Sequence, residues 1–254
     1  MPDVPPLAYH DRQFLDSEEG RPVRILSEYL GPLHAFRAAG INSTVVFFGS
    51  ARLRRGAALE RYLDEATELA RLLTEWSCRC VAGALVVCSG GGPGLMEAAN
   101  RGAALGGGRS IGLNIGLPQE QLPNPYITPG LSFEFHYFFM RKLWFAHLAR
   151  ALVVFPGGFG TLDELFEILT LAQTRKLTRG IPVLLYGTSF WKEVLNLPAL
   201  VRHGTIASED LQLFEFVDTP AAALQRLQAC IELPPESTPH APDFARSRCP
   251  PPRR

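Results

Sequence analysis

The sequence contains no apolar segment approaching the ~20 residues that a helix needs to cross a bilayer. Residues 1–15 are polar and contain proline, and they lack the apolar core of a secretory signal. We therefore expect a cytoplasmic protein that does not enter a membrane.

The cysteines and histidines lack the spacings that usually bind metal ions. There are 5 cysteines, an odd number without a CxxC pair, and 6 histidines without an HxH or HxxxH pair. Cys78 and Cys80 form an isolated CxC, which we interpret as incidental. These patterns predict reduced thiols, as in a cytoplasm, and no metal site built by the protein.

The sequence has no excess of charge of either sign, since 25 basic residues stand against 25 acidic ones. This balance argues against nucleic acid as a main partner, because proteins that bind nucleic acid usually carry a basic excess. It is compatible with a small anionic ligand held by a few local groups. A length of 254 residues with 46% hydrophobic content suffices for one large α/β domain or two small ones.

Apolar segments that do not alternate with polar residues predict strands of a parallel sheet, buried on both faces. They lie at residues 44–48, 85–88, 110–115, 152–155 and 182–186, with an edge strand expected at 214–217. Helical spacing of apolar residues separates them, at 57–76, 95–103, 137–149, 165–172, 190–197 and 220–231. This alternation predicts an α/β fold with a parallel sheet.

Two segments lie outside this alternation. Residues 22–39 predict a helix that covers a face of the sheet or a partner subunit, and residues 1–21 precede it as an irregular lead-in. Residues 234–254 are rich in proline, serine and arginine, so we expect a disordered tail. A single domain is therefore expected over residues 22–233.

The most informative stretch is residues 155–164, which read Phe-Pro-Gly-Gly-Phe-Gly-Thr-Leu-Asp-Glu. A predicted strand precedes it and a predicted helix follows, an arrangement that points backbone N–H groups at an anion. Neither the Walker A spacing nor the dinucleotide GxGxxG spacing is present. A capping box, with Thr161 as N-cap and Glu164 reaching back to it, is an alternative that would explain both residues.

Other candidate ligand contacts follow the predicted strands. Residues 89–94, Ser-Gly-Gly-Gly-Pro-Gly, form a second glycine loop between a strand and a helix. After the first strand, Ser50 and Arg52 are candidates for ligand contact, with a helix cap as the alternative role of Ser50. Loops that follow parallel strands meet at one edge of the sheet, so we expect the two glycine loops to form two sides of one crevice.

Arg141 and Lys142 lie within a predicted helix that is apolar on almost every face. Burying an unpaired charge is unfavourable, so at least one of the two should meet an anion. The alternatives are a structural pair with Glu134 or Asp163, or a side chain that reaches out to solvent.

Four motifs occur in the order known from one protein family. They are Val-Phe-Phe-Gly-Ser-Ala-Arg at 46–52, Ser-Gly-Gly-Gly-Pro-Gly-Leu-Met-Glu at 89–97, Met-Arg-Lys at 140–142, and Pro-Gly-Gly-Phe-Gly-Thr-Leu-Asp-Glu at 156–164. Together they resemble the Lonely guy family of cytokinin-activating phosphoribohydrolases, long labelled as lysine decarboxylases. The resemblance extends over roughly residues 22–231.

The resemblance implies a Rossmann-like, doubly wound sheet and a homodimer or higher homo-oligomer. It implies hydrolysis of the N-glycosidic bond of a nucleoside 5′-monophosphate, AMP or a cytokinin riboside monophosphate, to free base and ribose 5-phosphate. Arg141 and Glu164 match the family's catalytic pair. Its nucleotide-contacting positions match Lys142, Gly157, Gly158, Phe159, Gly160, Thr161, Leu162, Asp163 and Thr170. Further candidates within the motifs are Ser50, Gly91, Gly92, Gly94, Glu97 and Met140.

Two positions depart from the compact plant-type members, which usually have glycine in place of Glu97 and glutamate in place of Asp163. The N-terminal helix and residues 114–135 resemble a longer bacterial branch. These differences favour AMP-like nucleotides over cytokinin ribotides as the substrate class.

The residues also agree with this chemistry. Breaking an N-glycosidic bond builds positive charge on the ribose. One carboxylate, that of Glu164, can stabilise this charge or orient the attacking water. Asp163 and Glu164 are adjacent in the first turn of a helix, so they cannot both face one ribose. The two-carboxylate arrangement of ordinary glycosidases is therefore not expected.

Two alternatives belong to other functional classes. A non-catalytic carrier or sensor of nucleotides would have the same fold, but the presence of both Arg141 and Glu164 favours the hydrolase. A pyridoxal-dependent decarboxylase needs a lysine placed to form a Schiff base. No lysine in the sequence has such a setting, so we expect no cofactor.

Overall fold

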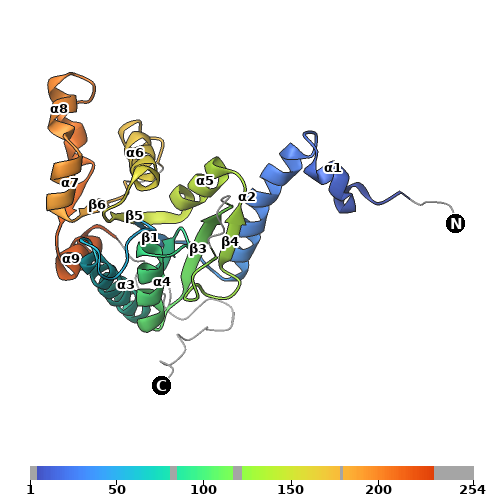
Figure 1. The fold of residues 1–254 in the computed structure, drawn as a ribbon, viewed down its shortest axis with the longest axis horizontal. Coiled ribbons are helices and arrows are strands. Elements are labelled where there is room, and N and C mark those ends of the chain that lie inside the picture. The colour runs from blue at the N-terminus through green and yellow to red at the C-terminus, as the bar shows by residue number, and fades with distance from the viewer. Residues whose placement is uncertain (1–4, 81–84, 117–121, 178–179, 232–254) are drawn as a thin grey trace, which may run out of the picture.

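A parallel sheet forms the centre of the molecule (Figure 1). The computed structural model describes residues 5–80, 85–116, 122–177 and 180–231, and these residues form one seven-stranded sheet in the order β4-β3-β2-β1-β5-β6-β7. The strands are β1 (Thr44–Phe48), β2 (Val86–Ser89), β3 (Ser110–Ile115), β4 (Ser132–Phe135), β5 (Ala149–Val154), β6 (Val183–Tyr186) and β7 (Glu215–Val217). The predicted α/β fold is confirmed.

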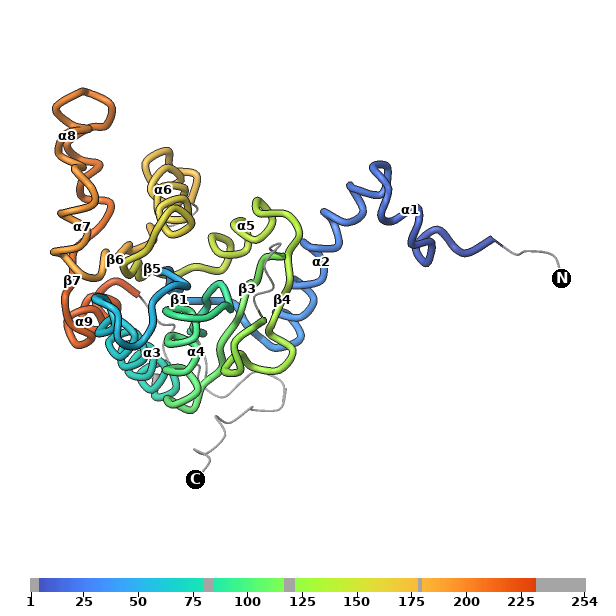
Figure 2. Tube along the Cα trace, in the orientation of Figure 1, coloured from blue at the N-terminus to red at the C-terminus, as the bar shows by residue number. Residues whose placement is uncertain are grey.

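Helices cover both faces of the sheet, which is therefore doubly wound (Figures 1 and 2). One face carries α3 (Arg61–Cys80), α4 (Leu95–Leu105) and α9 (Pro220–Cys230). The other face carries α2 (Arg21–Ala38), α5 (Phe138–Leu148), α6 (Phe159–Gln173) and α7 (Thr188–Val194). Shorter elements are η1 (Ala8–His10), α1 (Arg12–Asp16), α8 (Leu197–Arg202) and η2 (Ser208–Gln212).

The order of strand addition reverses at β1, which pairs with β2 on one side and with β5 on the other. Such a switch point leaves a crevice at the carboxyl ends of the two strands, where ligands usually bind. The N–H of Ser50 donates to the carbonyl of Pro156 at 3.1 Å, so the loops after β1 and β5 lie side by side. The glycine loop before α6 therefore lies at the switch point.

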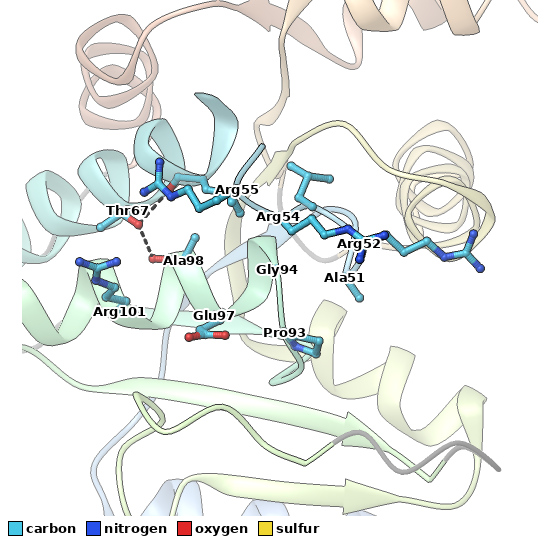
Figure 3. Close-up of a pocket in the computed structure, with 12 residues that line it drawn as sticks. Ala51, Arg52, Arg54, Arg55, Thr67, Pro93, Gly94, Glu97, Ala98 and Arg101 are labelled. Atoms are coloured by element: carbon cyan, nitrogen blue, oxygen red, sulfur yellow. Dashed lines mark hydrogen bonds between the residues drawn. The ribbon is translucent and has the colours of Figure 1, made fainter. Parts of the chain in front are cut away.

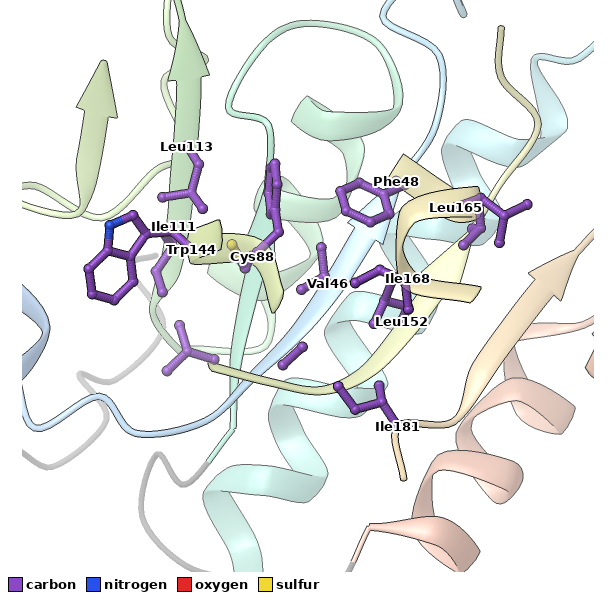
Figure 4. Close-up of a cluster of buried hydrophobic side chains, with 14 of the residues drawn as sticks. Val46, Phe48, Cys88, Ile111, Leu113, Trp144, Leu152, Leu165, Ile168 and Ile181 are labelled. Carbon is purple, nitrogen blue, oxygen red and sulfur yellow. The ribbon is translucent and has the colours of Figure 1, made fainter. Parts of the chain in front are cut away.

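Two apolar clusters, one on each face of the sheet, form the core. Along β1, Val46 and Phe48 belong to the cluster shared with α5 and α6, whereas Val45 and Phe47 belong to the cluster shared with α3 and α4. Figure 4 shows the first cluster, where Ile168 of α6 lies over β1 and β5. Both faces of β1 are buried, which is why its sequence does not alternate.

α2 lies outside the βα alternation and packs against α5, so it covers a face of the sheet. Tyr29 stacks on Trp144 of α5 with ring centroids 5.4 Å apart. The Glu28 carboxylate accepts two backbone N–H groups at the start of α5, at 2.7 and 3.3 Å. α2 therefore positions the helix that carries Arg141 and Lys142.

Within the expected lead-in, residues 8–10 form η1 and residues 12–16 form α1. Asp11 caps α1, since its Oδ1 accepts the N–H of Phe14 at 3.1 Å. Both elements lie beyond the N-terminal end of α2 and away from the sheet (Figure 1).

One strand was missed from the sequence. β4 pairs in parallel with β3 at the edge of the sheet, in a segment for which we predicted no strand. Its Ser132 and Glu134 are exposed and only Phe135 is fully buried. Two phenylalanines in four residues make a pattern too short to indicate a strand.

The predicted helix at 190–197 corresponds to α7, and a second helix, α8, which we did not predict, follows it. α7 ends at Val194 and the next residue is extended, after which Asn196 starts α8 by accepting the N–H of Ala199 at 3.2 Å. The predicted tail at 234–254 lies outside the described residues. None of the helices in the described ranges is long and apolar enough to span a bilayer.

Candidate active site

The glycine loop before α6 combines tight packing with open space. A side chain on Gly157 would collide with Thr161, so glycine is required there by packing. Nothing lies within 4 Å of a side-chain position on Gly158 or Gly160, and Phe159 is 93% exposed. The loop therefore leaves its backbone accessible at the start of α6.

The capping-box explanation of Thr161 and Glu164 is wrong. α6 begins at Phe159 with Gly158 as its N-cap, and no side chain caps it. Thr161 is buried inside the first turn, and the carboxylate of Glu164 is bound elsewhere. The first N–H groups of a helix have no intrahelical acceptor, so this uncapped end is suited to bind an anion.

The partner of Glu164 is Arg141, which reaches it from α5. Arg141 Nη2 donates to Glu164 Oε1 at 3.0 Å, and each side chain is only 11% exposed. The guanidinium also lies over the rings of Phe138 and Phe145, at 5.5 and 5.6 Å from their centroids. Its Nε is buried and has no hydrogen-bond partner in the part of the chain that the structure describes. The pair thus retains a buried donor for a further acceptor.

Burial changes the protonation of Glu164. Loss of hydration raises the pKa of this carboxyl from 4.5 to about 7, although the charge of Arg141 opposes the shift, and Asp163 adds to it. A carboxyl that titrates near neutral pH can exchange protons at physiological pH. This is the property that general acids and bases need.

Lys142 points to a different set of carboxylates. Its Nζ lies 2.6 Å from Asp163 Oδ2 and 3.4 Å from Glu167 Oε2. Burial lowers the pKa of Lys142, but the hydrogen bond to Asp163 and the charges of Glu167 and Asp163 outweigh it, and the pKa is raised. The structural pair with Asp163 considered above is thus present for Lys142, whereas Arg141 pairs with Glu164. Asp163 and Glu164 face different cations.

The second glycine loop lies next to Arg141. A side chain on Gly90 would begin 3.9 Å from Arg141 Nη1 and would also strike Met96. Gly94 has a φ of +66° and packs against the backbone of Ser50 and Ala51, where a side chain would begin 2.7 Å from either carbonyl oxygen. A side chain on Gly91 would collide with Asn114. The structure therefore brings the second glycine loop and Arg141 together.

A buried polar network holds the second glycine loop in place. Asn124 Nδ2 donates to the carbonyls of Gly91 and Gly92, at 3.0 and 3.1 Å, and to Asn100 Oδ1 at 2.9 Å. Asn100 Oδ1 also accepts the hydroxyl of Ser89 at 2.7 Å. With these carbonyls bound on the inside, the loop is held in one conformation. Sequence reasoning missed Asn124, because nothing in its polar loop distinguishes a buried asparagine from an exposed one.

Other predicted contacts are more widely spread. Ser50 Oγ accepts the N–H of Arg52 at 3.0 Å in a local turn. Met140 and Leu162 belong to the core, the first buried and the second partly buried. Thr170 is exposed and donates to the Phe166 carbonyl at 2.7 Å, roughly 16 Å along α6 from its start. Glu97 lies on α4, across the sheet from Glu164.

A cavity of about 320 Å³ lies at the switch point. Ser50 and Arg52 line it from the loop after β1, Pro156 and Gly157 from the loop after β5, and Phe190 from α7. The described ranges contain no group of three His, Cys, Asp or Glu residues that could hold a metal ion.

A sequence profile of the family described as "Possible lysine decarboxylase" matches residues 96–227, just over half of the chain. The match runs from α4 to α9 and includes the Arg141–Glu164 pair and the glycine loop before α6. The chain belongs to this family.

Two relatives of known name are similar to the chain in sequence. It is similar to the probable cytokinin riboside 5′-monophosphate phosphoribohydrolase LOGL5 of Oryza sativa subsp. japonica, at 26% identity over 79% of this chain and 77% of that protein. It is similar to the pyrimidine/purine nucleotide 5′-monophosphate nucleosidase of Escherichia coli strain K12, at 31% identity over 41% of this chain and 24% of that protein. The motif resemblance is thereby confirmed.

Among solved structures, the chain is similar to the structural-genomics protein TM1055, with a TM-score of 0.53 and 23% identity over 74% of this chain and 99% of that chain. This likeness concerns the fold alone. It agrees with the doubly wound sheet described above.

Proposed function

We propose that this family member hydrolyses the N-glycosidic bond of nucleoside 5′-monophosphates, releasing the free base and ribose 5-phosphate. The observation that carries the proposal is the buried pair of Arg141 on α5 and Glu164 on α6. Arg141 lies beside the second glycine loop, and Glu164 lies on the helix that follows the glycine loop at residues 155–160. The names of the rice and Escherichia coli relatives support the same reaction class.

In the proposed complex, the 5′-phosphate binds at the uncapped start of α6, where Gly158 and Gly160 leave the backbone accessible. This anchor places the ribose toward the pair formed by Arg141 and Glu164. The phosphate takes no part in the bond that breaks, so its binding energy can serve to orient the sugar.

The proposed reaction adds one water across the bond between ribose C1′ and the base nitrogen. Positive charge builds on the ribose as this bond breaks, and the ionised Glu164 stabilises it or accepts a proton from the attacking water. The base leaves with a proton on its nitrogen. Arg141 keeps the Glu164 carboxylate in position and offers its free Nε to an oxygen of the substrate.

The test of this function is phosphate dependence. AMP should yield adenine and ribose 5-phosphate, and adenosine should react at least about 100-fold more slowly, because it lacks the group that anchors the substrate. Free base can be quantified by liquid chromatography, with adenosine plus inorganic phosphate as the control. Equal turnover of AMP and adenosine would contradict the proposal.

The names of the two relatives indicate different bases in the substrate. One is named for cytokinin ribotides and the other for pyrimidine and purine nucleotides. We propose AMP-like nucleotides as the preferred class, since Glu97 and Asp163 depart from the plant-type motif. Adding GMP, CMP, UMP and a cytokinin riboside monophosphate to the same assay tests this preference. Binding of AMP without release of base would instead indicate a carrier.

The environment of the lysines argues against lysine decarboxylation by Schiff-base chemistry. The lysines of the chain are Lys142, Lys176 and Lys192. Lys142 is paired with two carboxylates that raise its pKa, whereas a Schiff-base lysine needs a lowered one. Lys192 lies over the ring of Phe216, 5.7 Å from its centroid.

We also propose that the chain forms a homodimer through an apolar surface on α2 and α5. An almost wholly apolar groove of about 560 Å³ lies between these helices. The exposed apolar residues around it are Val23, Leu26, Leu30, Phe138, Phe139 and Leu143. A second copy of the chain is the proposed occupant, because the surface is continuous with the helix that carries Arg141 and the family resemblance implies a dimer.

Sedimentation velocity tests the dimer. The wild type should sediment as a dimer. The double variant Leu26→Glu, Leu143→Glu should sediment as a folded monomer, because dimerisation would bury two charges in an apolar interface. Leu105→Glu, an exposed leucine on α4 across the sheet, is the matched control and should stay dimeric. A wild type that is monomeric at every concentration would refute the proposal.

We further propose a cytoplasmic location, which the free thiols of Cys88 and Cys230 support.

A further inference from the structure

The N-terminal arm, residues 7–16, projects from the molecule with little of its surface covered. It contains η1 and α1 and extends beyond the N-terminal end of α2, away from α5 and the sheet (Figures 1 and 2). None of its residues is buried, and the apolar Leu7 and Tyr9 are 59% and 67% exposed. By contrast, α3 and α4 pack on each other, and the Thr67 hydroxyl of α3 donates to the Ala98 carbonyl of α4 at 3.1 Å (Figure 3).

A hydrogen-bonded turn between α1 and α2 fixes the direction of the arm. The N–H of Gly20 donates to Ser17 Oγ at 3.1 Å. From α2, Arg24 Nη1 donates to the carbonyl of Ser17 at 2.8 Å and to that of Leu15. A side chain on Gly20 would collide with the carbonyls of Phe14 and Leu15, so the turn is tightly packed. While these contacts hold, the arm points away from its own chain.

An arm that is fixed in direction but unburied needs a surface to pack on. α1 has only five residues, and a helix this short is unstable in water on its own. One capping hydrogen bond, from the N–H of Phe14 to Asp11 Oδ1, offsets only part of this instability. Moving the side chains of Leu7 and Tyr9 out of water would stabilise the arm further. We therefore expect the arm to pack against a second surface.

The groove between α2 and α5 is a surface of the required kind. Its volume is about 560 Å³, its lining is almost wholly apolar, and it begins at Arg21, one residue after the turn. Arg21 is the one charged residue of that lining, whereas the arm carries two carboxylates, Asp11 and Asp16, against one cation, Arg12. The groove therefore suits the arm in both apolar character and charge.

We propose that the arm of one copy packs in the α2–α5 groove of a second copy, and that the second copy returns the same contact. This inference rests on the dimer proposed above and names the segment that occupies its groove. A second copy is the occupant because every chain carries both the arm and the groove, so a two-fold axis pairs both sets at once. A tyrosine buries roughly 150–250 Å², so the two Tyr9 rings would supply a sizeable part of the ~1,600 Å² of a typical interface.

Photo-cross-linking of the full chain identifies the surface that the arm contacts. Tyr9 is replaced by p-benzoylphenylalanine, a photoreactive aromatic residue, and the irradiated protein is separated on a denaturing gel and mapped by mass spectrometry. A covalent dimer is expected, with the cross-link at groove residues such as Leu26 or Leu143. The matched control carries the same group at Phe216, an exposed aromatic residue of β7 at the edge of the sheet far from α2, and should yield no covalent dimer (Figure 2).

A second measurement gives the strength of the contact. The double variant Leu7→Ser, Tyr9→Ser should fold normally and raise the dimer dissociation constant about 10-fold or more in sedimentation equilibrium. The control variant Val194→Ser, Leu200→Ser removes two exposed apolar residues from α7 and α8 and should leave that constant unchanged.

Several results would overturn the exchange of arms. They are a cross-link within one chain, a cross-link to a different surface of the second copy, a dimer without any cross-link, and an unchanged dissociation constant in the Leu7 and Tyr9 variant. A dimer that persists in these cases would leave dimerisation itself standing, whereas a monomeric wild type would refute both. Neither measurement uses base release, so an inactive protein would refute the proposed hydrolysis and leave the exchange of arms unaffected.

Discussion

Replacing Glu164 with glutamine should lower the rate of base release by about 100-fold or more, with normal folding. Glutamine keeps the shape of the side chain and can still accept the hydrogen bond that Arg141 Nη2 now donates at 3.0 Å. It removes the negative charge, which is the property that the proposed transition state needs. Base release and melting temperature should be measured on one preparation.

The matched control is Glu167→Gln, one turn further along α6. This change removes the same charge but alters only the 3.4 Å contact with Lys142, so the rate should stay within a few-fold of wild type. If Glu164→Gln folded normally and kept full activity, Glu164 would have only a structural role.

The raised pKa of Glu164 adds a pH dependence. Activity of the wild type should increase as the pH rises through about 7, where the carboxyl ionises, and the glutamine variant should lose this step.

The same shift has a defined sign for stability. A folded-state pKa above the unfolded value means that this carboxyl stabilises the fold fully below pH 4.5, and that the stabilisation is lost as the pH rises to about 7. The melting temperature of Glu164→Gln relative to wild type should therefore increase between these two values.

Replacing Arg141 with lysine should preserve the fold and still lower the rate of base release by about 10-fold or more. Lysine keeps the positive charge beside Glu164, so the carboxylate is not left unpaired. It cannot donate from a planar fork, and the buried Nε that is proposed to bind the substrate is lost. Melting temperature and base release of the variant decide whether Arg141 acts on the substrate or only stabilises the fold.

Removing the charge altogether gives a contrasting result. Arg141→Met should destabilise the protein by roughly 3–5 kcal/mol at neutral pH, the typical effect of leaving one member of a buried ion pair alone. Arg226→Lys, at an exposed pair with Glu215, is the control for the arginine-to-lysine change and should affect neither property. A lysine variant that unfolds easily but keeps its rate per folded molecule would make Arg141 a structural residue.

Much of the architecture followed from local patterns. The apolar runs at 44–48, 86–88, 151–154 and 183–186 are strands buried on both faces, as expected for a parallel sheet between two helical layers. The helices after the glycine loops were also predictable, since their apolar residues recur at helical spacing. β4 was not predicted, because at the edge of the sheet only Phe135 is fully buried.

The motifs identified the two glycine loops and the Arg-Lys pair, but not which charges meet. From the sequence, the capping box explained Glu164 as well as catalysis did, because both need a glutamate near a helix start. The distinction lies in where α6 begins and in what faces it from α5. Those two features depend on the packing of two helices over one sheet.

The sequence by itself determined most of the strands and helices, the glycine bends and the family, because these depend on residues close together in the chain. Tertiary structure alone decided that Arg141 pairs with Glu164 and Lys142 with Asp163. It also placed Asn124 beneath the second glycine loop. Pairing and burial are set by residues distant in sequence, and the free energy of a charge depends on those neighbours far more than on its place in a motif.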